Sequence, residues 1–184
     1  MTITAQPSNG GPMTTARILT TLTGAALIAA SVTAAAIPAS ASATPPRCSA
    51  YHLVTALEDP VATGGNTGAV LVAGNNGRTA CTVSGYPRLG LTRHGRHVPS
   101  ATTDGATYFQ PDPGPSVIVL PPHATAVAYV GYGTVSGTGN VRASRLTVRI
   151  RGARWGHSVR LPGAPTAITN GVLTVTAWAI AREG

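Results

Sequence analysis

Arginine side chains alternate with apolar ones in the run Arg145-Leu146-Thr147-Val148-Arg149-Ile150-Arg151. Successive side chains of an extended strand point to opposite faces, so this alternation predicts one apolar face and one basic face. Guanidinium groups bind phosphate and carboxylate groups through paired hydrogen bonds, and a row of them attracts polyanions. The alternative interpretation is a solvated outer face that binds nothing.

A second strand, residues 157–161, is expected to pair with this one through the turn at 152–156. Val159 and Leu161 then face the core and Arg160 faces outward. The indole ring of Trp155, at the tip of the turn, is suited to stack on a sugar or a base, or else to cap the end of the core. The candidate binding residues of this basic face are Arg145, Arg149, Arg151, Arg154, Trp155 and Arg160.

The residue types that catalysis needs are scarce, since the chain has only five His and five acidic residues. It contains no Gly-x-Ser-x-Gly elbow, His-Glu-x-x-His pair or phosphate-binding loop. Glu58 and Asp59 are adjacent, so they cannot flank a glycosidic bond. His94 and His97 lie across a turn, but the sequence supplies no third metal ligand, and the arginines beside them repel a cation. We therefore expect no catalytic residue, no metal site and no cofactor.

An export signal is expected at the N-terminus, where Arg17 precedes an uncharged, mostly apolar stretch and a run of small residues. Cleavage is expected after Ala43, with Ala41 as the alternative, and Met13 is a candidate start. Residues 1–43 are thus predicted to be a signal-peptide helix, and 44–184 a single secreted or cell-envelope-associated domain. An uncleaved membrane anchor is the alternative.

Cys48 and Cys81 are the only cysteines. An even number of cysteines in an exported chain predicts a disulfide, here expected to tie the first strand to the third. Zinc binding by the two thiols is the alternative.

Apolar residues of the exported part recur with a period of two, and Gly, Pro and Asn interrupt them at short intervals. This pattern predicts an all-β fold, a two-sheet antiparallel sandwich of about seven to nine strands. The expected strands are residues 50–57, 69–73, 81–84, 88–92, 116–120, 124–132, 145–151, 157–161 and 172–179.

One stretch, residues 99–115, is predicted to be a long loop that contains Tyr108 and Phe109. Loops of this length in compact domains often serve as recognition surfaces, so both aromatic residues are candidate binding residues. The alternative is that they cover an open end of the sandwich.

The trio Gly85-Tyr86-Pro87 follows Cys81 and is interpreted as structural. Glycine permits conformations closed to other residues, tyrosine anchors a strand corner, and proline fixes the direction of the chain.

These features, in their order along the chain, resemble a known family. The order is Cys48 after an export signal, Cys81, the Gly-Tyr-Pro trio, a Leu-x-Leu pair, a Gly turn, an apolar run into Pro121-Pro122 and a long alternating strand. It is similar to that of the secreted actinobacterial proteins with domain of unknown function 4232, over about residues 48–175. The resemblance implies an immunoglobulin-like β-sandwich, secreted or envelope-associated, without an assigned activity. It also implies a second cysteine pair near Asn140 and Asn170, where this chain has no cysteine.

The chain has a net charge of +8, and all 13 of its positively charged residues are arginine. We expect an exported non-catalytic β-sandwich that binds a cell-envelope or extracellular partner through its basic face. The expected partners are an anionic envelope polymer or another envelope protein, with no specific nucleic acid and with membrane contact only through the signal peptide. The alternatives are a small secreted hydrolase or protease inhibitor without a recognisable motif, and a purely structural role.

Overall fold

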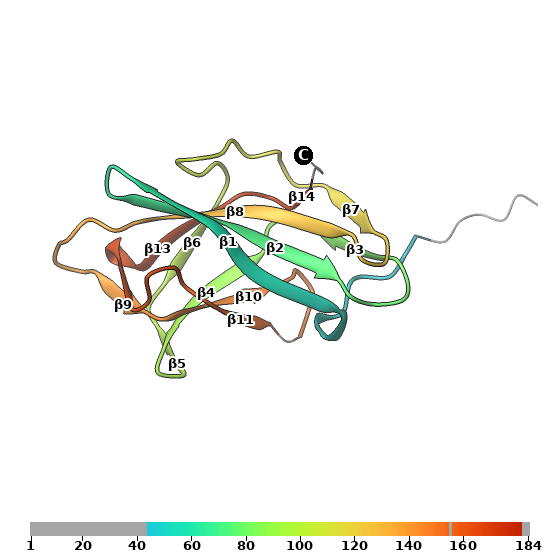
Figure 1. Cartoon of the computed structure of the whole chain (residues 1–184), viewed down its shortest axis with the longest axis horizontal. Coiled ribbons are helices and arrows are strands. Elements are labelled where there is room, and N and C mark those ends of the chain that lie inside the picture. The colour runs from blue at the N-terminus through green and yellow to red at the C-terminus, as the bar shows by residue number, and fades with distance from the viewer. Residues whose placement is uncertain (1–43, 155, 182–184) are drawn as a thin grey trace, which may run out of the picture. The chain divides into compact units, whose positions relative to one another are not determined.

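The computed structural model describes residues 44–154 and 156–181. These residues belong to one compact unit, Ser42–Gly184, built from β-strands and two short 3₁₀ helices (Figure 1). The expected signal peptide and Trp155 lie outside the described residues. Within those two ranges, no helix is long and apolar enough to cross a membrane.

The larger sheet has six strands, in the order β1-β2-β8-β13-β6, and β14 also pairs with β8. β1 and β2 form a hairpin whose turn contains Gly64 and Gly65, with φ of 55° and 75°, which glycine adopts without steric cost. β6 runs parallel to β13, while the other pairs are antiparallel. The strands are β1 (Leu53–Thr63), β2 (Asn66–Asn75), β6 (Ala101–Asp104), β8 (Thr125–Gly133), β13 (Val172–Val175) and β14 (Ala179–Ile180).

The second sheet has four antiparallel strands in the order β11-β10-β4-β5, and two further strand pairs complete the unit. The four strands are β4 (Arg88–Arg93), β5 (Arg96–Val98), β10 (Arg145–Arg149) and β11 (His157–Arg160). The two pairs are β3 (Cys81–Ser84) with β7 (Val117–Leu120), and β9 (Val141–Ala143) with β12 (Thr166–Ile168). The 3₁₀ helices are η1 (Ala50–His52) and η2 (Thr169–Gly171).

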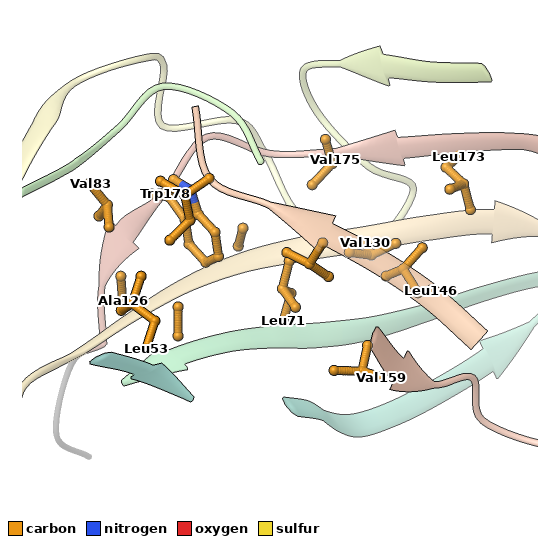
Figure 2. Packing of buried hydrophobic residues seen from close by; sticks show 14 of the residues in the cluster. Leu53, Leu71, Val83, Ala126, Val130, Leu146, Val159, Leu173, Val175 and Trp178 are labelled. Atoms are coloured by element: carbon orange, nitrogen blue, oxygen red, sulfur yellow. The ribbon is translucent and has the colours of Figure 1, made fainter. Parts of the chain in front are cut away.

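Alternate side chains of both sheets fill one apolar core (Figure 2). On β10, for example, Leu146 and Val148 are buried whereas Arg145 and Arg149 are exposed. Trp178, between β13 and β14, is only 1% exposed and belongs to the same cluster. Removing this apolar surface from water is the main force that holds the two sheets together.

The predicted all-β sandwich is confirmed, but the strands are more numerous than the sequence indicates. β1 and β2, with 11 and 10 residues, are longer than predicted, whereas β10, β11 and β13 are shorter. One pair of strands departs from the antiparallel pattern, since β6 runs parallel to β13. Residues 99–115 were expected to be a loop without strands, yet β6 lies within them. Its sequence, Ala-Thr-Thr-Asp, lacks apolar alternation, and backbone pairing with β13 makes it a strand.

Two predicted strands end early for local reasons. The strand expected at 145–151 stops at Arg149, because a turn follows in which the Ala153 amide donates to the Ile150 carbonyl (2.9 Å) and Gly152 has φ 85°. The strand expected at 172–179 is split into β13 and β14. At this break the Tyr129 amide donates to Thr176 Oγ1 (2.9 Å), a side-chain acceptor in place of a backbone one.

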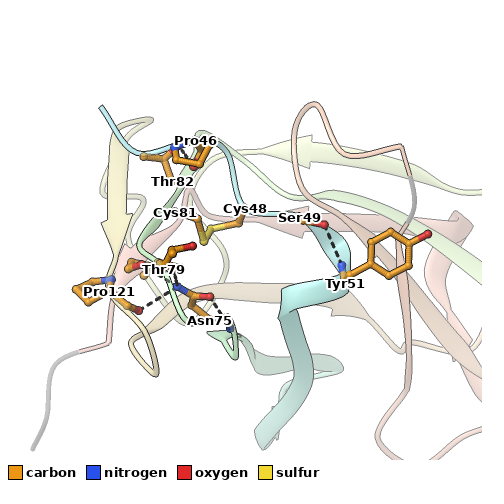
Figure 3. Close-up of a disulfide and its surroundings, with 11 residues drawn as sticks. Pro46, Cys48, Ser49, Tyr51, Asn75, Thr79, Cys81, Thr82 and Pro121 are labelled. Carbon is orange, nitrogen blue, oxygen red and sulfur yellow. Dashed lines mark hydrogen bonds between the residues drawn. A yellow bond between two sulfur atoms is a disulfide. The ribbon is translucent and has the colours of Figure 1, made fainter. Parts of the chain in front are cut away.

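The predicted disulfide is present, with a Cys48–Cys81 Sγ–Sγ distance of 2.04 Å (Figure 3). Cys48 precedes β1, so the bond ties the N-terminal segment, and not the first strand, to β3. Backbone hydrogen bonds support it on both sides, from Cys48 to Thr82 (2.9 Å) and from Thr82 to Pro46 (2.8 Å).

Asn75 lies close to this disulfide and is 1% exposed (Figure 3). Its Nδ2 donates to the carbonyls of Thr79 and Leu120 (both 3.0 Å), and its Oδ1 accepts from the amide of Gly77 (3.0 Å). A buried amide with both ends bonded fixes the β2–β3 connection against the end of β7.

The segments around Asn140 and Asn170, where the resemblance implies a second cysteine pair, lie beside each other. The carbonyl of Val135 accepts hydrogen bonds from Asn140 Nδ2 (2.8 Å) and from Thr169 Oγ1 (3.3 Å). Polar contacts thus connect the two segments in this chain.

Replacing Cys48 and Cys81 together by alanine is predicted to lower the free energy of unfolding by about 3 to 4 kcal/mol, because the closed loop restricts the unfolded chain. Chemical denaturation of both proteins with and without reductant measures the difference. Reductant should destabilise the unmodified protein and leave the double variant unchanged. Two alkylatable thiols in the purified protein before reduction would contradict the assignment.

Candidate functional site

The four-stranded sheet has a basic outer face. Its strands contain no acidic residue, and four of their six arginines face outward: Arg88, Arg145, Arg149 and Arg160. The other two, Arg93 and Arg96, are in phase with Leu91 and Val98 at the end of the β4–β5 hairpin. Because Leu91, Leu146 and Val148 face the core, the residues between them face solvent. The outward arginine positions of neighbouring strands therefore come together across the sheet.

The strand register places arginines directly opposite one another. Arg149 of β10 pairs with Arg88 of β4, and Arg145 of β10 pairs with Arg160 of β11. Like charges at directly opposed positions destabilise a sheet. An anion bound between the paired guanidinium groups would remove this repulsion.

A hollow of about 270 Å³ opens in this face above Gly90. A Cβ atom at Gly90 would meet no heavy atom within 4 Å, so the absent side chain leaves open space. At Gly156 a Cβ would collide with Cγ of Arg149, so glycine there lets the Arg149 stem pass close to the backbone. The side chains around the hollow are those of Arg88, His97, Thr147, Arg149 and Arg154.

The chemistry of this lining is that of an anion site. Three guanidinium groups, each with several N–H donors, surround one hydroxyl and one imidazole ring, and no carboxylate of the described residues lines the hollow. Planar guanidinium groups match the spacing of phosphate and carboxylate oxygens. The hollow is close to the lower limit of small-ligand pockets, about 300 Å³, and fits one phosphate-sized group of a larger ligand.

The residues predicted from the sequence do not all meet at this hollow. Arg149 and Arg154 line it. Arg145 instead donates from Nε and Nη2 to the hydroxyl and carbonyl oxygens of Ser158 (both 2.7 Å), and Arg160 Nη2 reaches the carbonyl of Ala164 (3.5 Å).

Arg151 lies in the turn after β10 and lines a different hollow, together with Arg47. Trp155 lies outside the described residues. The structure therefore places Arg149 and Arg154, among the predicted arginines, at the hollow.

The sequence did not predict Arg88 and Thr147 as binding residues, and it indicated His97 only as a candidate metal ligand. The alternation Arg88-Leu89-Gly90-Leu91 is visible in the sequence, but it does not reveal that β4 lies next to β10. Among the described residues, no cluster of three or more side chains could hold a metal ion.

The two candidate aromatic residues of the β6–β7 connection have different environments. Phe109 lies on the outer face of the larger sheet, where its ring occupies the space that a side chain at Gly68 would need. Tyr108 is 68% exposed and contacts Phe109 edge to face, with ring centroids 5.2 Å apart. The connection covers a sheet face, not an open end of the sandwich, and only Tyr108 presents its ring to solvent.

The Gly85-Tyr86-Pro87 trio contributes to holding this connection in place. The Tyr86 hydroxyl donates to Asp112 Oδ2, and Asp112 Oδ1 accepts from the Ala177 amide (2.8 Å). At Gly85, φ is 63°, and its carbonyl accepts from the Trp178 amide (3.0 Å). Asp112 thus links the trio to the segment that carries the buried Trp178.

The pKa of Asp112 reflects these contacts. Desolvation by itself raises the pKa of the carboxyl, but hydrogen bonds from Tyr86 and from the amides of Ala177 and Gly114 outweigh it, so the pKa lies below its ordinary value. The pKa of Tyr86 is raised, first by its hydrogen bond to Asp112 and then by desolvation and nearby carboxylates.

The fold and site define a disulfide-linked β-sandwich domain with a basic outer face. The chain belongs to the family of the domain of unknown function DUF4232, whose model matches residues 48–179. Neither a search of curated proteins nor a search of solved structures finds a match.

Replacing Asp112 by asparagine is predicted to lower the melting temperature at neutral pH and to flatten its pH dependence. A carboxyl whose pKa is depressed in the folded state stabilises the protein above its unfolded pKa of about 4, and this contribution is lost as the pH falls through the folded pKa. Thermal unfolding from pH 7 to pH 3 should show the two proteins converging at low pH. A constant difference over this range would contradict the role given to the carboxylate.

Proposed function

We propose that this protein is an exported, non-catalytic domain that binds an anionic cell-envelope or extracellular polymer through the arginine-lined hollow above Gly90. The observation that carries the proposal is the direct opposition of Arg149 and Arg88 beside this hollow. Such a pair costs stability in the free protein, and bound phosphate or carboxylate groups would offset that cost.

The composition of the surrounding face supports a polymer as the ligand. Outward-facing arginines lie on three of the four strands, and none of the four strands contains an acidic residue. They are Arg88 on β4, Arg145 and Arg149 on β10, and Arg160 on β11. A polymer with repeated negative charges can contact the hollow and the flanking arginines at once, which raises its affinity above that of a single anion. The disulfide between Cys48 and Cys81 is compatible with an extracellular location.

The non-catalytic part of the proposal rests on the lining of the hollow. General acid–base catalysis needs a proton donor and an acceptor aimed at one substrate, and nucleophilic catalysis needs a base that activates the nucleophile. The described lining offers Thr147 and His97, but it contains no carboxylate to orient the imidazole ring. Its chemistry supports binding of an anion.

Replacing Arg88 or Arg149 by glutamine is predicted to weaken binding to immobilised inorganic polyphosphate about tenfold, because each change removes one charge-assisted contact. Arg142→Gln is the matched control, since Arg142 is an exposed arginine on β9 with the same charge. Retention of all four proteins is measured at two salt concentrations, and higher salt should weaken it.

Equal losses in the three variants would show that net charge alone drives retention and would refute the assigned site. Retention of the unmodified protein that does not respond to salt, or no retention, would also refute the proposal.

A further inference from the structure

The larger sheet also carries a hollow on its outer face, about 290 Å³ in volume and different in chemistry from the basic one. Cross-strand register places Gly68, Gly131 and Thr174 in one row and Asn66 beside Gly133 in the next. Neighbouring side chains approach these outward-facing glycines closely: Phe109 lies above Gly68, Thr107 and Thr174 lie beside Gly131, and Thr169 lies beside Gly133. The hollow is the space that remains between these side chains, Tyr108 and the segment around Asn170.

Tyr108 forms one wall of the hollow with a largely exposed ring. Its position is fixed by the turn that contains it. The Thr107 amide donates to the Gln110 carbonyl (2.9 Å), and the Gln110 amide donates to Thr107 Oγ1 (3.0 Å). The edge-to-face contact with Phe109 supports the ring from one side. Tyr108 is thus a preorganised aromatic surface.

Neutral polar groups surround the rest of the hollow. Thr174 Oγ1 donates to the Gly131 carbonyl (3.1 Å) and Asn66 Nδ2 to the Gly64 carbonyl (3.4 Å), which leaves oxygen lone pairs free to accept. Asn170, at φ 51°, lies with its Oδ1 where a side chain at Gly139 would be. The polar side chains of the lining are Asn66, Tyr108, Thr169, Asn170 and Thr174, all of neutral residue types. The Tyr132 side chain instead packs in the core, where it is 5% exposed.

We propose that this hollow binds one ring of a neutral carbohydrate. A sugar ring has an apolar C–H face that packs on an aromatic ring and a rim of hydroxyl groups that both donate and accept hydrogen bonds. The amides of Asn66 and Asn170 and the hydroxyls of Thr169 and Thr174 offer complementary groups within one ring-sized volume. The neutral character of this lining disfavours the phosphate groups that the basic hollow would bind.

The test is a titration of the isotope-labelled protein in which the chemical shifts of its backbone amides are measured by NMR. The four sugars are cellohexaose, maltohexaose, mannohexaose and N-acetylchitohexaose. At least one sugar should shift the amides of Gly131 and Gly133. Tyr108→Ala should lower the affinity for that sugar about tenfold or more. Tyr108→Phe should retain most of the affinity. Asn170→Gly should lower the affinity while permitting the same backbone conformation.

Two control variants distinguish this hollow from the rest of the protein surface. Tyr51→Ala removes another exposed tyrosine, 85% exposed in η1, and should leave sugar binding unchanged. Arg149→Gln should also leave it unchanged, so failure of the polyphosphate test and failure of this one are distinguishable.

No amide shift with any of the four sugars at millimolar concentration overturns the proposal, and this is the result expected if the hollow takes an apolar peptide instead. Equal weakening by Tyr108→Ala and Tyr51→Ala, or shifts confined to residues away from the hollow, overturns it as well.

Discussion

Burial of alternate side chains from two sheets in one apolar core is the constraint on which the rest of this structure depends. Leu146 and Val148 of β10 and Leu91 of β4 must face Leu71 and Trp178 across the sandwich. Strand geometry then directs every intervening side chain to solvent. The basic face is therefore a consequence of the core register, and moving one strand by one residue would bury arginines and expose leucines.

Both hollows lie beside outward-facing glycines of their sheets. Gly90 leaves open space among arginines on the four-stranded sheet. On the six-stranded sheet, threonine side chains approach Gly131 and Gly133 closely, and the hollow lies beside them among amides, hydroxyls and Tyr108. Glycine inside a strand costs stability relative to residues with a side chain, so both faces carry an energetic cost at their hollows. The two hollows differ in charge, which gives the two proposals different ligands and independent tests.

The sequence predicts those features that depend on local alternation or on counting. The inward and outward faces of β10, its pairing with β11 and the Cys48–Cys81 bond follow from local patterns, and the structure contains all three. The hollow could not be predicted, because it requires β4, more than fifty residues earlier in the chain, to lie beside β10 in a specific register. β6 was missed for a related reason, since its pairing with β13 and not its composition makes it a strand.

The central claim is that anionic groups bind in the hollow above Gly90. The substitution Gly90→Val tests it most directly, because valine fills the hollow without changing any charge. A Cβ at Gly90 meets no atom within 4 Å, and a β-branched residue suits a strand opposite Thr147, so the variant should fold with equal or greater stability. Its affinity for inorganic polyphosphate, measured by calorimetry, is predicted to fall about tenfold or more. Unchanged affinity in the folded variant would contradict the account, because the arginines would then bind without the hollow.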